Sequence, residues 1–191
     1  GNASTSPLVL EALLLDGASA AFTLSVPPLS SRAFATAGLL DTPGRVASPL
    51  RLRVVSGDAA AVAASARVFN VAEAGTFGLS FPVARAGESV LGRDATALLF
   101  GPRDPRAERL NVSLFAPFEA SAAEVAVIGP SGTLRRSLRV ELAALRRAQL
   151  DDLLSGEEPG ASVRVTVLSG RVQTYGTAIS NGPTNDPWRV P

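Results

Sequence analysis

The densest group of side chains able to do chemistry is acidic and lies late in the chain. Asp151 and Asp152 are followed by Glu157 and Glu158. Paired carboxylates serve as the acid and base of glycosidases, and carboxylate oxygens are ligands for Ca²⁺. Asp side chains also cap short helical turns. Since the group flanks an expected helical turn, we favour capping and solvation over calcium binding, and calcium binding over catalysis. We therefore assign no catalytic residue, no metal ligand and no cofactor.

The aromatic residues offer a second kind of site, a platform for a sugar ring. Tyr175 and Trp188 are the only Tyr and Trp, and Asn181 lies between them in a segment rich in turn formers and oxygen atoms. A single Trp in a β-sheet protein more often packs in the core or at a sheet edge. We favour packing and an Asx-type turn, and keep these three residues as an alternative ligand platform.

Four residue types are missing from the sequence. It holds no His, Cys or Met, and all 18 basic residues are Arg, so Lys is absent too. Without His and Cys there is no imidazole base, thiolate, zinc knuckle or disulfide. The net charge of +1 gives no electrostatic case for binding nucleic acid or an anionic membrane. The composition therefore predicts a protein that is not an enzyme.

The sequence also suggests where the protein works. No run of 18 apolar residues is present, so we expect no membrane span. The chain begins at Gly1 and contains no Met, which either signal-peptide removal or a cut from a longer chain explains. We expect an extracellular, cell-surface location after signal-peptide removal. Asn2 and Asn111 fit the glycosylation sequon, but Asn111 lies in an expected strand, where we expect it to hydrogen-bond a loop.

Alternating apolar residues indicate β-strands over most of the chain. Phe22–Val26 is an example that ends at a Pro pair. We expect two hairpins, one turning at Gly129–Gly132 and the other at Ser169–Gly170. The only helical signals we accept are short turns at Ala35–Leu40 and Ala148–Leu154. The pattern predicts an all-β, antiparallel fold.

The sequence contains an internal repeat with a long period. The matching pairs of segments are Ala18–Ala21 with Ala120–Ala123 and Val54–Gly57 with Val167–Gly170. The offset is 102 residues at the first pair (120 minus 18) and 113 at the second (167 minus 54). Such a period fits a small domain rather than a solenoid unit. We expect two tandem Ig-like β-sandwich domains, copy one at 1–86 and copy two at 87–191.

The repeat also decides one ambiguous segment. Asp58–Ala66 is rich in Ala and has helix propensity. Its counterpart in copy two, Val172–Thr177, alternates as a strand does. We therefore predict a strand at Asp58–Ala66.

The motifs of copy two resemble a known module. Asn111–Pro117 fits an Asn-x-x-Leu-x-x-Pro element, Leu150–Leu153 a Leu-Asp-Asp turn, and Tyr175–Pro191 an ending with Asn and Asp-Pro. On these motifs copy two resembles a β-sandwich module found singly or in pairs in secreted bacterial proteins. Copy one ends with Ser65–Asn70 followed by Gly75–Pro82, and this ending resembles the partner of that module. The resemblance implies a sandwich fold and an extracellular setting, in which the module accompanies enzymes or adhesins or makes up surface proteins, and it implies no reaction.

The two copies differ at their start. A leading strand, Thr96–Phe100, begins copy two, whereas copy one has no equivalent before its first apolar stretch. A sheet that lacks a strand exposes an unpaired edge. Either the edge needs no partner, or the strand belongs to a longer parent chain, or a strand from another copy fills it by β-augmentation. The candidate assembly residues in that apolar stretch are Leu8, Leu10, Leu13 and Leu15.

These observations favour a non-enzymatic extracellular structural protein. We expect a subunit of a surface filament or other assembly held by edge-strand pairing, with other copies of itself as partners. The alternative is a carbohydrate- or protein-binding accessory or adhesion module that contacts a surface glycan or protein through Tyr175, Trp188 and Asn181. An enzyme ranks third, because the usual bases and nucleophile pairs are absent.

Overall fold

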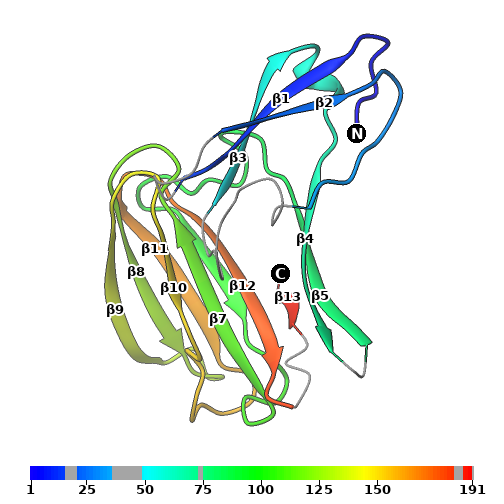
Figure 1. Ribbon diagram of the computed structural model, residues 1–191. Helices are drawn as coiled ribbons and strands as arrows, with labels where there is room; N and C mark the ends of the chain where they lie inside the picture. Colours follow the sequence, from blue (N-terminus) through cyan, green and yellow to red (C-terminus); the bar gives the residue numbers. More distant parts are fainter. Residues whose placement is uncertain (16–20, 36–48, 73–74, 183–186, 191) are drawn as a thin grey trace. The chain divides into compact units, whose positions relative to one another are not determined.

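The computed structural model describes residues 1–15, 21–35, 49–72, 75–182 and 187–190, and strands dominate them (Figure 1). One short 3-10 helix, η1 (Ala59–Ala61), is the single helical element in these ranges. The strands are β1 (Leu8–Leu14), β2 (Phe22–Val26), β3 (Leu50–Ser56), β4 (Ser65–Ala72), β5 (Gly75–Pro82), β6 (Thr96–Phe100), β7 (Glu108–Phe115), β8 (Ser121–Ile128), β9 (Leu134–Leu142), β10 (Arg147–Leu150), β11 (Ser162–Ser169), β12 (Gln173–Ser180) and β13 (Pro187–Val190). The expected all-β class is confirmed.

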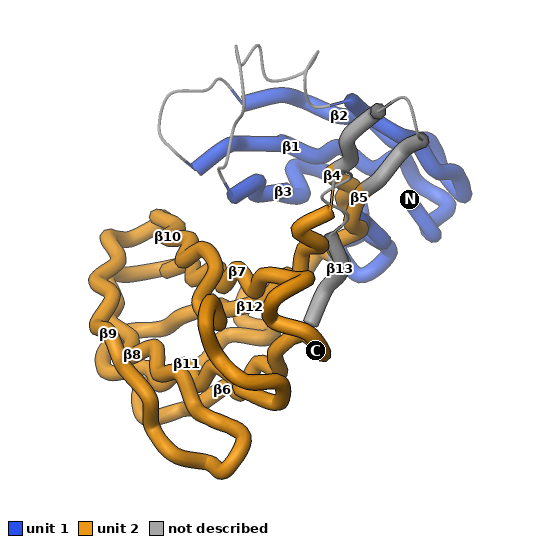
Figure 2. Tube along the Cα trace, turned by 90° about the horizontal axis from the view of Figure 1, so that it is seen from below, with its two compact units in different colours: residues 1–65 blue, residues 66–191 orange. Residues whose placement is uncertain are grey.

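The chain divides into two compact units, coloured separately in Figure 2. Unit 1 is Gly1–Ser65 and unit 2 is Ala66–Pro191. The contacts between residues place β4 and β5 in unit 2, whereas the sequence repeat assigns them to copy one. The division into repeat copies at 1–86 and 87–191 stays a prediction.

Unit 1 is built on a three-stranded antiparallel sheet in the order β2-β1-β3. Alternate residues of β1, from Leu8 to Leu14, point to one face and are buried. Leu24 and Val26 of β2 join them in a small core, with Leu52 of β3 partly buried against it. The predicted strands at Phe22–Val26 and in the apolar stretch from Leu8 are therefore confirmed.

Unit 2 contains two four-stranded sheets that share one core. We call β6-β11-β8-β9 the leading sheet and β10-β7-β12-β13 the facing sheet. All the pairings recorded within them are antiparallel. The core draws on both sheets: Leu99, Val125 and Val165 come from the leading sheet, and Leu110 and Val112 from the facing sheet. This is a β-sandwich arrangement, and β6 is the leading strand that the sequence predicts.

The expected hairpin at Gly129–Gly132 is confirmed. Strands β8 and β9 pair on either side of it. The turn is closed by two backbone hydrogen bonds, from Gly129 N to Thr133 O at 2.8 Å and from Gly132 N to Gly129 O at 2.9 Å. Gly132 has a φ of 82°, a conformation that glycine adopts without strain.

The expected hairpin at Ser169–Gly170 is wrong. Strands β11 and β12 lie in different sheets, so the turn carries the chain across the sandwich. Gly170 has a φ of 68°, and an added Cβ would lie 2.4 Å from Ser121 Oγ. That hydroxyl accepts a hydrogen bond from the backbone N–H of Arg171 at 3.0 Å. A glycine turn reverses the chain in either arrangement, so the local sequence does not decide which strand becomes the neighbour.

Of the two expected helical turns, the one at Ala148–Leu154 is wrong, and the one at Ala35–Leu40 lies almost wholly outside the described residues. Ala148–Leu150 belong to β10, because they pair with β7, and a non-helical turn follows at Leu153–Gly156. Of the segment Ala35–Leu40, only Ala35 is described, and it lies outside any helix.

The predicted strand at Asp58–Ala66 is wrong for its first part. Ala59–Ala61 form η1, where Asp58 accepts a hydrogen bond from the backbone N–H of Ala60 at 2.8 Å as the N-cap. The strand β4 begins only at Ser65. Helix propensity therefore prevails over the repeat at the Ala-rich positions.

Candidate functional site

The acidic group identified from the sequence is engaged in local pairing. Glu157 lies 3.8 Å from Arg136 Nη1 and Glu158 lies 3.9 Å from Arg135 Nη2. Asp151 accepts a hydrogen bond from Gln149 Nε2 at 2.6 Å. Within the described ranges, no group of three or more His, Cys, Asp or Glu side chains is placed to hold a metal ion. Asp151, Glu157 and Glu158 are thus engaged in local hydrogen bonds and ion pairs.

The described side chains of the alternative ligand platform, Tyr175 and Asn181, each contact other parts of unit 2. The Tyr175 ring packs edge-on against Phe81, with 5.6 Å between ring centroids and 68° between planes. Asn181 accepts a hydrogen bond from Arg109 Nη1 at 2.9 Å and donates one to the carbonyl of Arg106 at 3.4 Å. The backbone of Trp188 lies in β13 opposite Ala178, and its side chain lies outside the described part. Tyr175 and Asn181 thus make structural contacts.

Both sequon asparagines form structural hydrogen bonds. Asn2 is buried, and its Nδ2 donates to the carbonyls of Ser6, Val26 and Pro27 at 2.8, 3.2 and 3.2 Å. Asn111 Oδ1 accepts from the backbone N–H of Asp152 at 3.1 Å, which confirms that Asn111 holds a loop.

The four candidate assembly residues do not share a face. Leu8 and Leu10 are buried in the core of unit 1, while Leu13 is half-buried on the opposite face of β1. Leu15 follows the end of the strand. Strand β1 is paired on both sides, by β2 and by β3, so its own edges are already used. The assembly role of these residues stays a prediction.

The edge strands of the sandwich, which sequence analysis did not rank, differ in their protection. Strand β9 carries three arginines, and Arg139 pairs with Glu141 at 2.5 Å. Strand β10 is only four residues long. Charged and short edge strands are the usual ways in which proteins prevent pairing between molecules. Both strands are therefore protected edges.

Strand β6 lacks such protection. It pairs with β11 and, within the described part of the chain, with no other strand. Its sequence, Thr96–Phe100, contains no charge, and Leu98 and Phe100 are 45% and 59% exposed. An uncharged, exposed edge with large apolar side chains is a template for an added strand. The sequence shows that this strand carries no charge, but only the pairing shows that it lies at the sheet's edge.

The two-stranded sheet of β4 and β5 has a second open edge. Among the described residues, β4 is hydrogen-bonded to β5 alone. On the other side β5 lies near β13 of the facing sheet (Figure 1). Val68 of β4 is 66% exposed. Two-stranded sheets are marginally stable by themselves, so a third strand on β4 would stabilise this one.

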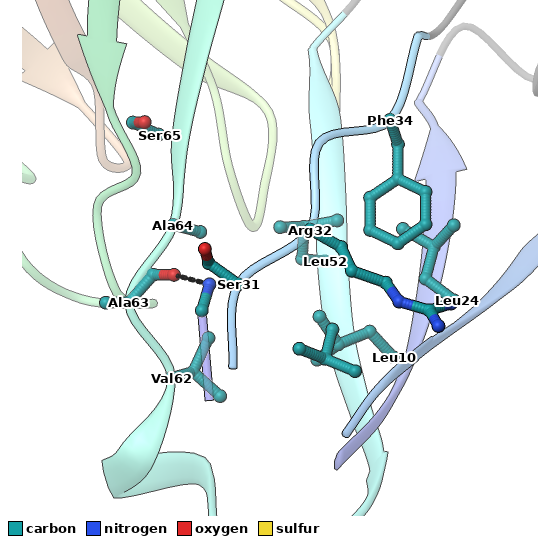
Figure 3. Close-up of a pocket in the computed structure, with 12 residues that line it drawn as sticks. Leu10, Leu24, Ser31, Arg32, Phe34, Leu52, Val62, Ala63, Ala64 and Ser65 are labelled. Atoms are coloured by element: carbon teal, nitrogen blue, oxygen red, sulfur yellow. Dashed lines mark hydrogen bonds between the residues drawn. The ribbon is translucent and has the colours of Figure 1, made fainter. Parts of the chain in front are cut away.

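An apolar cavity lies on the core face of unit 1. Its volume is about 380 Å³, and its floor is formed by Leu10, Leu24, Val26 and Leu52. Figure 3 shows Arg32, Phe34, Leu24 and Leu10 on one side of it and the segment from Val62 to Ser65 on the other. The cavity is the place where the core of unit 1 is incompletely filled.

Comparisons of the chain with models of protein families, with curated proteins and with solved structures find no match. In the described residues, no helix is both long and apolar enough to cross a bilayer.

Proposed function

We propose that this chain is a non-enzymatic extracellular structural protein, a subunit of a surface filament whose copies join by edge-strand pairing. The observation that carries the proposal is the contrast between β6 and the edge strands β9 and β10. Strand β9 is protected by arginines and β10 by its shortness. Strand β6 presents Leu98 and Phe100 beside an open backbone edge. Edges that must stay unpaired are protected, so an unprotected edge favours pairing.

A filament is favoured over a closed dimer because the described strands of unit 2 present two different open edges, β6 and β4. Pairing of β6 with β6 would be isologous and would stop at two copies. Pairing of β6 with β4 of the next copy is heterologous, and it repeats from copy to copy unless the rotation closes a ring. It would also give the β4–β5 sheet its third strand. We therefore assign β6 and β4 as the two halves of the contact.

The proposal also includes the class of β-sandwich to which the two repeat copies belong. We assign both repeat copies to the Ig-like sandwich class, with copy one incomplete. The support is that β7 and β12 lie in the facing sheet and β8 and β11 in the leading sheet, so that the chain crosses between two antiparallel sheets as in a sandwich. The resemblance of Asn111–Pro117 and Tyr175–Pro191 to a module of secreted bacterial proteins supports the extracellular location.

The alternative, a carbohydrate- or protein-binding module, is less well supported. Its platform requires Tyr175 to present a free ring face beside Asn181. The Tyr175 ring is instead packed against Phe81, and Asn181 bonds Arg109 and the backbone of Arg106. These contacts favour a structural role for both residues.

Electron microscopy and light scattering of the purified chain test the proposal. The wild type is expected to form fibres of uniform width, and its mean mass in solution should rise with concentration. Leu98→Lys places a charge on the open edge and should abolish fibres. Leu134→Lys is the matched control, because Leu134 is 58% exposed on the protected strand β9. Fibres should persist in this control.

Two results would contradict the proposal. A wild-type protein that stays monomeric at high concentration would remove the filament. Fibres that survive Leu98→Lys but vanish with Leu134→Lys would place the contact on β9 instead of β6. Circular dichroism of both variants confirms that each keeps its strands, so that a loss of fibres is not a loss of fold.

A further inference from the structure

Among its described lining residues, the cavity of unit 1 combines an apolar floor with one charged side chain, and the Gly1 amino group, which donates to Ala63 O, also lines it. Leu10, Leu24, Val26 and Leu52 form the floor, and Val62 adds a further apolar side. Its volume of about 380 Å³ falls within the usual range for small-molecule sites, roughly 300–1,000 Å³. Such sites are mostly apolar with a few polar groups that fix the ligand's orientation.

The charged group is Arg32. It is exposed, and among the described residues no hydrogen bond or ion pair engages its side chain. Among the described residues that line the cavity, none is Asp or Glu. The acid nearest in sequence to the floor, Glu11, points to the opposite face of β1 and pairs with Arg53 at 2.8 Å. Figure 3 shows the Arg32 side chain extending alongside Leu24 and Leu10, close to the ring of Phe34. A positive charge thus stands beside an apolar hollow.

The backbone beside the cavity is already hydrogen-bonded. The backbone N–H of Ala63 donates to Gly1 O at 3.2 Å, and Ala63 O accepts from the Gly1 nitrogen at 2.5 Å. The N–H of Ala3 donates to Ala61 O at 3.0 Å. An extra strand would find this side of the cavity occupied. The cavity therefore suits a ligand held by apolar contact and one charge rather than by a β-ladder.

We propose that this cavity binds a small amphipathic anion, an aliphatic chain that ends in a carboxylate. The chain lies on Leu10, Leu24, Val26 and Leu52, and the carboxylate pairs with the Arg32 guanidinium. Arginine favours carboxylates because its planar fork can donate two parallel hydrogen bonds. This site is independent of the strand edges on which the filament proposal rests.

Titration of the purified chain with decanoate and with decanol tests the site, since the two ligands share a chain and differ in charge. Decanoate should bind about tenfold more tightly than decanol, as a hydrogen-bonded charge pair predicts. Arg32→Gln should remove that preference and leave decanol binding unchanged. Arg51→Gln is the control, because Arg51 is exposed on β3 and does not line the cavity. It should keep the preference.

Methyl NMR of Leu10, Leu24 and Leu52 locates the ligand. Their signals should shift with decanoate, and Ala64→Phe, which fills the cavity, should weaken binding of both ligands. The proposal would be overturned if the wild type bound decanoate no more tightly than decanol, as is expected of Arg32→Gln. It would also be overturned by signals that move with protein concentration and not with ligand, because a second copy would then cover this face.

Discussion

Strands β1 and β7 occupy matching places in the repeat, and the two units bury them in the same way. At the offset of 102 residues, Leu8 and Leu10 correspond to Leu110 and Val112. Leu8 and Leu110 are both fully buried, and alternate residues of each strand face a core. The hydrophobic pattern therefore gives the same inward face in both units.

Strands β3 and β11 match in sequence but differ in burial. Val163, Val165 and Val167 of β11 are fully buried between the leading and facing sheets of unit 2. At the offset of 113, the counterpart of Val163 is Leu50, which is 41% exposed, and Leu52 and Val54 are half-buried. The difference teaches that alternation selects a face, whereas a covering sheet decides how completely that face is buried. The described strands β1, β2 and β3 form a single sheet, and the cavity lies on its core face.

The largest expected effect compares core truncations in the two units. Leu110→Ala should destabilise unit 2 by about 4 kcal/mol, because the close-packed core cannot close around the cavity that the substitution leaves. Leu8→Ala should destabilise unit 1 by only about 2 kcal/mol, since the smaller, partly open core relaxes or hydrates around the site. Urea unfolding followed by Trp188 fluorescence reports unit 2, and circular dichroism reports both units.

Two separate transitions are expected in the wild type, with unit 1 unfolding first. Leu8→Ala should move only the first of them. A single transition shifted equally by both variants would contradict the separation into independent cores.

Gly57 and Gly170 directly follow β3 and β11 and match each other in the sequence repeat. Gly57 and Gly170 both have positive φ, 104° and 68°, and a Cβ would lie 2.9 Å from Pro7 O and 2.4 Å from Ser121 Oγ respectively. Replacing each by Ala should cost about 2–3 kcal/mol through strain and close contact. Gly132→Ala is the control, with a φ of 82° and nothing within 4 Å, and should cost about 1 kcal/mol. Thermal unfolding measures all three, and equal costs would show that the close contacts do not matter.

Asn2 is buried in unit 1, whereas Asn111 bonds a loop of unit 2. Asn2→Ala removes the donor to three carbonyls in unit 1 and should cost about 2 kcal/mol. Asn111→Ala removes one hydrogen bond to the exposed turn at Asp152 and should cost about 1 kcal/mol. Urea unfolding measures the loss of stability in each variant. A larger loss for Asn111→Ala than for Asn2→Ala would contradict the larger structural role assigned to Asn2.

The smallest effect concerns the ion pair on the outer face of unit 1. Glu11 and Arg53 lie opposite each other on β1 and β3, 2.8 Å apart. Arg53→Gln should cost about 0.5 kcal/mol at low salt, because the Arg side chain is largely exposed. The difference should vanish in high salt, which screens the pair. A cost that persists in high salt would point to packing by the Arg53 stem.

Strand positions were predictable from the sequence because alternation is a local property. Phe22–Val26 and Thr96–Phe100 are strands as expected. Strand partners were not predictable, since they depend on distant segments. The turn at Ser169–Gly170 crosses between sheets, and Ala148–Leu150 form a strand only because β7 lies beside them.

The candidate site was less predictable than the fold. The sequence drew attention to carboxylates, aromatic residues and Leu8–Leu15, which carry the obvious chemistry. The open edge of β6 and the cavity beside Arg32 depend on which described strands pair and on which side chains come together around the core of unit 1. Neither property is visible before the pairing is known.

Hydrogen exchange at β6 tests the central claim most directly. Gly101 N donates to Ala161 O of the connection preceding β11, so alternation in the ladder directs the amides of Leu98 and Phe100 to the open edge. In dilute monomer these two amides should exchange fast, and in the assembled protein they should be protected at least tenfold more strongly. Outer-edge amides of β9 should stay fast in both states. Leu98 and Phe100 amides that exchange equally fast in both states would contradict pairing through β6.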